Sequence, residues 1–197
     1  MKLLLATKNK HKVEEMRALL SDLAQVEVVS AADFPGVEEP EETGETFEDN
    51  ARLKARYYAE VTGLTALADD SGLVVDALDG RPGVMSSRYG ADDAARIARL
   101  LEELRDTHDA QRTARFECAM VLVRPGAGGD AAATRGTLEG SIAREARGTN
   151  GFGYDPVFHL PARGLRLAEL SSDEKNAVSH RGNALREMVK ALREMVG

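Results

Sequence analysis

Residues 2–23 read KLLLATKNKHKVEEMRALLSDL, and this stretch decides the fold class. Residues 3–6 form a short apolar run, so we expect a buried strand at residues 2–6. After this run the apolar side chains recur at helical spacing, so we expect a helix from about Asn9 to Leu23. The positions on its apolar stripe are Val13, Met16, Leu20 and Leu23. A buried strand that leads directly into an amphipathic helix indicates an α/β protein.

The rest of the chain continues this alternation. Further strands are expected at residues 26–29, 65–68, 73–77, 112–123 and about 131–140. Further helices are expected from Thr46, from Asp92 to Arg105 with Ala94, Ile97, Ala98 and Leu101 on one face, and from about Ser179 as the N-cap. Between the second and third of these strands lies Asp69-Asp70-Ser71-Gly72, which is typical of a turn. The order predicts an α/β fold with a mixed, twisted β-sheet.

Composition and charge limit the classes of protein to which this chain can belong. A chain of 197 residues can bury about 70% of the surface that its unfolded form exposes, so one domain over residues 1–197 is expected. Its single cysteine, Cys118, can form neither an internal disulfide nor a zinc cluster. The net charge of −7 disfavours nucleic acid as a partner. Neither a signal peptide nor an apolar run of about 20 residues is present, so we expect a cytoplasmic protein without a membrane partner.

The charges are segregated along the chain. Four of the seven lysines lie in the first twelve residues, and seven carboxylates lie between Glu38 and Asp49, a stretch without Lys or Arg. The basic segment Thr7–Lys12 joins the first strand to the first helix. Such a junction presents backbone N–H groups and the positive end of the helix dipole, which suit phosphate. The alternative is a solvated basic turn.

Two further segments carry charged side chains where apolar ones are expected. Lys54 falls on the apolar stripe of its helix, so it either extends along its stem to solvent or faces an anionic partner. Asp69 and Asp70 follow a buried strand. With Glu41 or Glu42 they could form a two-carboxylate magnesium site, because Mg²⁺ takes one or two protein carboxylates and completes its shell with phosphate and water. The alternative is a turn in which aspartate bonds its own backbone.

The last two segments combine flexibility with flat or cationic groups. Residues 148–156 read GTNGFGYDP, in which glycines surround Phe152 and Tyr154, so an aromatic ring could stack on a flat ligand. The alternative is an ordinary turn with Tyr154 packed in the core. Residues 171–183 contain Lys175, His180 and Arg181, which either face a ligand or form a polar helix start.

Together these segments resemble the inosine triphosphate pyrophosphatase family, also called XTP/dITP diphosphatases. The matching stretches are ATKNKHK (6–12), ETGETFEDNARLKA (42–55), ALADDSGLVVDALDGRPGVMSSRYG (66–90), GFGYDPVF (151–158) and ELSSDEKNAVSHRGNAL (169–185). They occur in the family's order and spacing from end to end of the chain. One departure is Lys8, where many members have a small residue.

The resemblance implies an elongated α/β fold with an active-site cleft between two lobes, assembled as a homodimer. It implies Mg²⁺-dependent hydrolysis of dITP, ITP and XTP to the nucleoside monophosphate and pyrophosphate, which removes deaminated purines from the nucleotide pool. In this pattern Asp70 is the general base, and Glu41 shares the metal with it. The substrate-binding residues that it implies are Thr7, Lys8, Asn9, Lys10, His11, Lys12, Lys54, Ser71, Phe152, Gly153, Tyr154, Asp155, Lys175, His180 and Arg181.

Two other functions remain open at this stage. A related pyrophosphatase for pyrimidine or methylated nucleotides would share the phosphate and metal chemistry and differ only in its base pocket. A non-catalytic nucleotide-binding module would lack turnover, and the paired aspartates with the acidic segment disfavour it. A panel of triphosphates separates all three.

Overall fold

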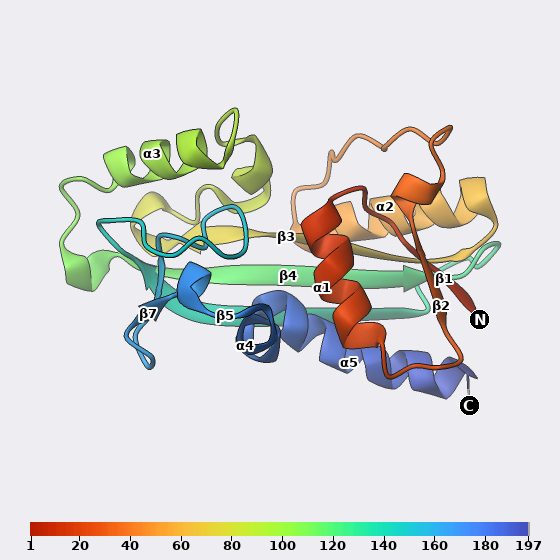
Figure 1. Cartoon of the computed structure of the whole chain (residues 1–197). Coiled ribbons are helices and arrows are strands. Elements are labelled where there is room, and N and C mark those ends of the chain that lie inside the picture. The colour runs from red at the N-terminus through yellow and green to blue at the C-terminus, as the bar shows by residue number, and fades with distance from the viewer. Residues whose placement is uncertain (197) are drawn as a thin grey trace. The chain divides into compact units, whose positions relative to one another are not determined.

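The computed structural model describes residues 1–196 and contains a seven-stranded sheet in the order β2-β1-β3-β4-β5-β6-β7 (Figure 1). The strands are β1 (Lys2–Leu5), β2 (Glu27–Ser30), β3 (Thr65–Val75), β4 (Thr113–Val123), β5 (Ala132–Ile142), β6 (Phe158–Leu160) and β7 (Leu165–Arg166). The helices are α1 (Lys10–Leu20), α2 (Phe47–Thr62), α3 (Asp93–Glu103), α4 (Ser172–Val178) and α5 (His180–Val196). The sheet is mixed, because β1 is parallel to β2 and β3 whereas β6 is antiparallel to β5 and β7. The expected fold class is therefore confirmed.

The chain forms two compact units. The first unit comprises residues 1–70, 118–136 and 181–197, and the second comprises residues 71–117 and 137–180. Strands β3, β4 and β5 each contribute residues to both units. Among the described residues, no helix is long and apolar enough to cross a membrane. The cleft between two lobes stays a prediction.

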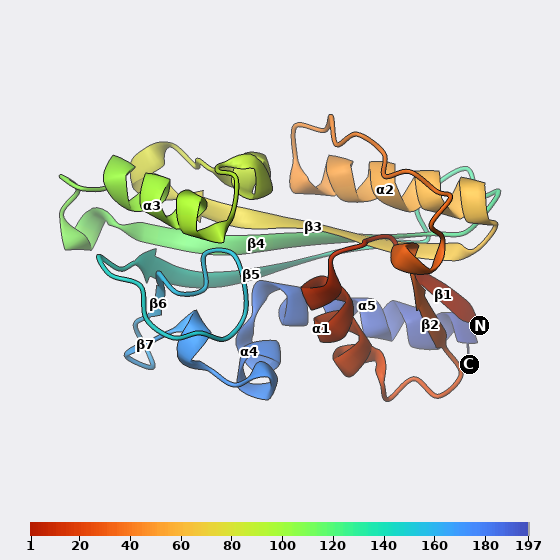
Figure 2. The same cartoon turned by 45° about the horizontal axis from the view of Figure 1, so that its top comes forward.

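In the first unit, helices cover both faces of the sheet (Figure 2). Successive side chains of a strand point to opposite faces, so neighbouring residues enter different cores. Leu67 of β3 packs with α1 and α5, in a core that includes Met16 and Leu185. Its neighbours Ala66 and Ala68 pack against α2, in a second core with Tyr58. Burial on both faces explains why three consecutive leucines follow the exposed Lys2 in the first strand, KLLL.

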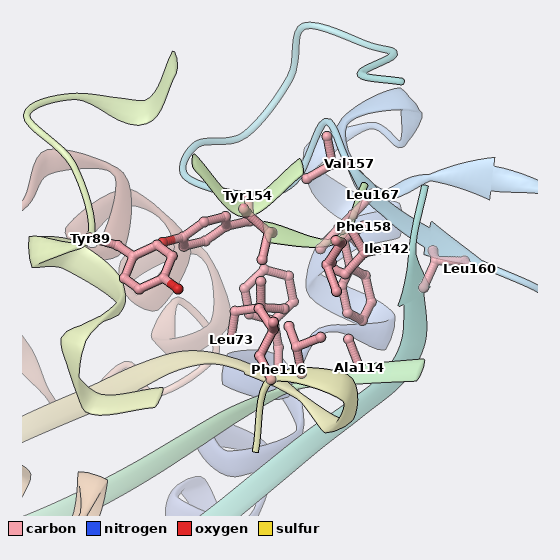
Figure 3. Close-up of a cluster of buried hydrophobic side chains, with 14 of the residues drawn as sticks. Leu73, Tyr89, Ala114, Phe116, Ile142, Tyr154, Val157, Phe158, Leu160 and Leu167 are labelled. Atoms are coloured by element: carbon pink, nitrogen blue, oxygen red, sulfur yellow. The ribbon is translucent and has the colours of Figure 1, made fainter. Parts of the chain in front are cut away.

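The second unit has one core of its own, which contains four of the nine aromatic residues of the chain. Figure 3 shows Leu73 of β3, Phe116 of β4 and Tyr154 among these buried side chains. Helix α3 contributes Leu100 and Leu104, both fully buried. The expected face of this helix is partly wrong, since Ala94 and Ala98 are exposed. Alanine fits either face of a helix, so leucine is the better guide to the buried side.

The expected turn at Asp69-Asp70-Ser71-Gly72 is wrong. These four residues lie inside β3, which runs without interruption from Thr65 to Val75. The strand lies between β1 and β4, so the neighbouring strands can satisfy its backbone groups, and a turn there would leave such groups buried and unpaired. The two consecutive carboxylates therefore sit in the interior of a central strand.

Most of the other boundaries are close to the expected ones. Asn9 caps α1, and Thr46 caps α2 by accepting a hydrogen bond from the Asp49 N–H. The helix expected to run to Leu23 ends at Leu20. Ser179 is the C-cap of α4, a helix that the sequence did not reveal, and α5 starts at the next residue. The side chain of Val196, expected on the stripe of α5, lies outside the described side chains.

Candidate active site

The first cluster of polar residues lies where the order of parallel strands reverses. Strand β1 has β2 on one side and β3 on the other, and the connecting helices α1 and α2 pack on opposite faces of the sheet. Ligands of α/β sheets collect beyond the carboxyl ends of strands at such a point. Leu5 ends β1 opposite Leu67, so Asp69 and Asp70 lie two and three residues beyond that pairing. We call their surroundings the Asp69–Asp70 cluster, which comprises Lys12, Glu15, Glu42, Asn50, Lys54, Asp69, Asp70 and Arg181.

Asp69 points to the face that α1 and α5 cover. Its carboxylate lies 3.0 Å from Lys12 Nζ and accepts hydrogen bonds from Arg181 Nε and Nη2 at 3.2 and 3.1 Å. Arg181 Nη1 also donates to Glu15 at 2.5 Å. Asp69 and Arg181 are each about 1% exposed. Asp69 thus belongs to a buried network of alternating charges.

Asp70 points to the opposite face, towards α2. Its Oδ1 lies 3.4 Å from Lys54 Nζ, and its Oδ2 accepts a hydrogen bond from Asn50 Nδ2 at 3.2 Å. Lys54 also donates a short hydrogen bond to Glu42, from the acidic segment. Of the two alternatives for Lys54, the structure therefore shows the anionic partner. Because successive side chains of a strand point to opposite faces, the two adjacent aspartates have different partners.

Their surroundings also drive the pKa values of the two aspartates apart. Burial alone would raise the pKa of Asp69, but the positive charges of Lys12 and Arg181 outweigh it and hold that pKa well below its ordinary value. Burial raises the pKa of Asp70, and the charge of Lys54 offsets this only in part. A pair of carboxyl groups with diverging pKa values is typical of acid–base chemistry. The surroundings of Asp69 therefore favour its ionised form, whereas those of Asp70 make its carboxylate easier to protonate.

The donor set around Asp70 fits a hard cation. The carboxylates of Asp70 and Glu42 both contact the ammonium group of Lys54. Carboxylate oxygens therefore already surround one positive charge. Among the described residues no group of three or more His, Cys, Asp or Glu side chains could hold a metal. Mg²⁺ needs only one or two carboxylates when phosphate supplies further ligands. Glu41 is exposed, so its predicted role as a ligand stays a prediction.

The basic segment before α1 is built as a helix cap. Asn9 Oδ1 accepts hydrogen bonds from the backbone N–H groups of His11 and Lys12, at 3.0 and 3.3 Å. To bind here, a phosphate would have to displace the Asn9 side chain from these N–H groups or accept a hydrogen bond from the side-chain nitrogen of Asn9. Lys10 and His11 are exposed, and the Thr7 hydroxyl accepts from the Asn9 N–H.

Lys8 of the basic segment binds a backbone carbonyl group. Its Nζ donates to the carbonyl oxygen of Val37 at 2.8 Å. Lys8, which departs from the family pattern, therefore connects the basic segment to the residue just before the acidic segment.

A second cluster lies in the second unit, around the loop that carries GFGYD. We call it the Lys175 cluster, and it comprises Asp93, Phe152, Gly153, Asp155 and Lys175. Lys175 Nζ donates to Asp155 at 2.6 Å and lies 4.6 Å from the centre of the Phe152 ring. Asp155 also accepts from the Phe152 N–H, and Asp93 of α3 accepts from the Gly153 N–H at 2.7 Å. Two successive N–H groups of the turn are thereby held by carboxylates.

The two aromatic residues of this loop differ in exposure. Tyr154 lies in the core, where its hydroxyl donates to the Ser86 carbonyl at 2.9 Å (Figure 3). Phe152 keeps part of its ring exposed, so it is the ring that can stack on a ligand. His180 is buried and stacks on Phe116 with ring centres 4.7 Å apart. Ser71, half-buried, follows Asp70 in β3.

Sequence reasoning missed three of these residues. Asn50 could have been found, because it is a polar residue beside Ala51 on the buried side of α2, one turn before Lys54. Asp93 carries no such signal, since an acidic residue is ordinary in the first turn of a helix, and neither does Glu15, a charged residue in the middle of α1.

Comparison with known proteins places this geometry in a family. The sequence profile of the Ham1 family matches residues 3–191. A dITP/XTP pyrophosphatase of Shigella flexneri is 50% identical over 195 residues, covering 98% of both chains. A HAM1 protein structure from Coxiella burnetii has a TM-score of 0.89 and 46% identity, covering 98% of this chain and 99% of that one. A nucleoside-triphosphatase / dITP/XTP pyrophosphatase structure from Mycobacterium abscessus has a TM-score of 0.76 and 48% identity, covering 95% and 97%. The match spans nearly the whole sequence and both of its units, and the chain therefore belongs to the Ham1 family.

Proposed function

We propose that this protein is a pyrophosphatase, a hydrolase that converts dITP, ITP and XTP to the nucleoside monophosphate and pyrophosphate. The observation that carries the proposal is the buried Asp70 carboxylate, with its raised pKa, between Lys54 and Asn50 at the carboxyl end of β1. The names and full-length identities of the relatives support the substrate class.

The Asp69–Asp70 cluster is proposed to bind the triphosphate and activate water. Asp70 accepts a proton from water while the water oxygen bonds to the α-phosphorus. The bond from that phosphorus to the bridging oxygen breaks, and pyrophosphate leaves in one piece. Lys12 and Lys54 neutralise charge on the phosphates, which is most of what phosphoryl transfer requires of a protein. Thr7 and Asn9 add hydrogen bonds from the helix start.

Mg²⁺ would be held by Asp70 with Glu42, and Glu41 is the alternative second ligand. When bound, it would supply charge neutralisation at the phosphate oxygens. Lys54 contacts both carboxylates, so its ammonium lies beside the residues that would hold the metal and could neutralise charge on the phosphates.

The Lys175 cluster is proposed to bind the base. Phe152 offers its ring for stacking, and Lys175 is a hydrogen-bond donor only. The 6-oxo group of inosine and xanthine accepts such a bond, whereas the 6-amino group of adenine does not. An unmatched buried donor is costly, so ATP is disfavoured. Arg181 stays a predicted substrate-binding residue, and in this structure its guanidinium binds Asp69 and Glu15.

One assay tests the proposal. dITP, ITP, XTP, GTP and ATP are incubated with and without Mg²⁺, and pyrophosphate and orthophosphate are measured separately. We expect Mg²⁺-dependent release of pyrophosphate from the first three. In water enriched in ¹⁸O, the label should enter the monophosphate, because water attacks the α-phosphorus. Orthophosphate as the first product, label in the pyrophosphate, or equal turnover of ATP and ITP would contradict the proposal.

The resemblance also implies a homodimer. Light scattering on the purified chain tests that part independently of activity.

A further inference from the structure

Asn50 is a fully buried amide that touches the acidic segment and Asp70 at the same time. It lies in the first turn of α2 and is 0% exposed. Its Oδ1 accepts a hydrogen bond from the backbone N–H of Gly44 at 2.7 Å. Its Nδ2 donates to Asp70 Oδ2 at 3.2 Å. A carboxamide has one acceptor end and one donor end, so only this orientation satisfies both contacts.

The approach of the acidic segment to Asn50 requires a glycine. A Cβ atom on Gly44 would lie 2.7 Å from Asn50 Oδ1 and 2.7 Å from Asp49 Cβ. Both distances are well below van der Waals contact, so any larger residue would push the segment away from α2. Gly44 is two residues from Glu42, whose carboxylate meets Lys54. The position of Glu42 therefore depends on the hydrogen bond and close contact between Gly44 and Asn50.

The two oxygens of Asp70 are thereby given different partners. Asn50 holds Oδ2, while Oδ1 faces Lys54. A carboxylate held at one oxygen by a buried donor keeps one orientation of its side chain, which a general base needs in order to reach its water molecule.

We propose that Asn50 is a positioning residue, which orients the Asp70 carboxylate and fixes the acidic segment at Gly44 so that Glu42 and Asp70 stay together. The proposal rests on the proposed function, in which Asp70 acts on water. It assigns Asn50 no contact with substrate.

Two variants separate the contacts of Asn50. Asn50→Asp keeps an acceptor for the Gly44 N–H but replaces the donor to Asp70 Oδ2 with an oxygen, so the contact with Asp70 is lost and a second buried carboxyl group repels it. Asn50→Ala removes both contacts. Asp49→Asn is the matched control, because it changes a charge one residue away on the exposed side of the helix.

We expect kcat for dITP to fall about 100-fold in Asn50→Asp with KM within about threefold, since misplacement of a reacting group lowers turnover more than binding. Amide hydrogen exchange at Gly44, measured by NMR, should stay slow in Asn50→Asp and become at least about 100-fold faster in Asn50→Ala. Asp49→Asn should stay within about twofold of the wild type in both measurements.

The outcomes distinguish the two proposals. Near-normal kcat in Asn50→Asp, in a wild type that does hydrolyse dITP, overturns the role of Asn50 alone. A wild type without turnover of dITP or XTP overturns the proposed function instead. If Asn50→Asp does not fold, Gly44→Ala decides: we expect lower kcat with KM nearly unchanged, and wild-type kinetics would contradict the proposal.

Discussion

The two candidate clusters are constructed in different ways. The Asp69–Asp70 cluster is carried by a central strand and by helices on both of its faces, and its charges are held by other charges. The Lys175 cluster is built around a loop that carries Phe152, Gly153 and Asp155, and carboxylates that accept its backbone N–H groups set its shape. Rigid elements hold reacting groups within tight geometric limits, whereas a loop can adapt to a ligand. The difference suggests that chemistry belongs to the first cluster and recognition to the second.

A second contrast lies inside the first cluster. Asp69 and Asp70 are neighbours, yet one is locked into a network of cations and the other is held by a single lysine and an amide. A substitution at Asp69 should therefore lower the stability of the fold, whereas a substitution at Asp70 should lower turnover.

Asp70→Asn has the largest expected effect. The amide cannot accept a proton from water, so kcat for dITP should fall about 10²- to 10⁴-fold. The fold should remain, because Lys54 keeps Glu42 as a partner. Steady-state kinetics and thermal melting followed by circular dichroism measure the two effects. Turnover close to that of the wild type would remove Asp70 from the mechanism.

Asp69→Asn should act on stability first. It removes the counter-ion that the buried Arg181 shares with the half-buried Lys12 and leaves Arg181 with Glu15, which costs up to about 3–5 kcal/mol in the free energy of unfolding. Chemical denaturation of both variants gives the comparison directly. If Asp69→Asn were as stable as Asp70→Asn, the separation of roles along the strand would be wrong.

Asp93→Ala should weaken recognition and spare chemistry. Loss of the acceptor for the Gly153 N–H loosens the loop that carries Phe152, so KM for dITP should rise about tenfold with kcat within about threefold. The matched control is Asp92→Ser, which keeps a cap for α3 and leaves the hydrogen bond from Gly153 to Asp93 in place. A fall in kcat without a change in KM would place Asp93 in the chemistry instead.

The sequence predicted the segments that carry the site better than it predicted their geometry. Lys54 was singled out because a lysine on an apolar stripe is anomalous, and its anionic partners are indeed present. The paired aspartates were expected in a turn, because Asp-Asp-Ser-Gly has local turn chemistry. In the protein, the strands on both sides of β3 and the cations from three helices outweigh that local preference. Such contacts join residues up to 112 positions apart, as between Asp69 and Arg181, and no local pattern encodes them.

The smallest effect concerns Cys118, which reports on the Asp69 side of the first cluster. Burial raises the pKa of this thiol to about 12, and the negative charge of Asp69 adds to the shift. At pH 8 about one thiol in ten thousand would be ionised, and labelling requires an accessible thiolate. Native protein should therefore react with iodoacetamide only through opening of the structure. Because Asp69→Asn weakens this region, it should speed labelling by at least about tenfold, whereas Asp93→Ala should not. Equal acceleration in the two variants would mean that the clusters do not open independently, and the contrast between them would then describe contacts and not stability.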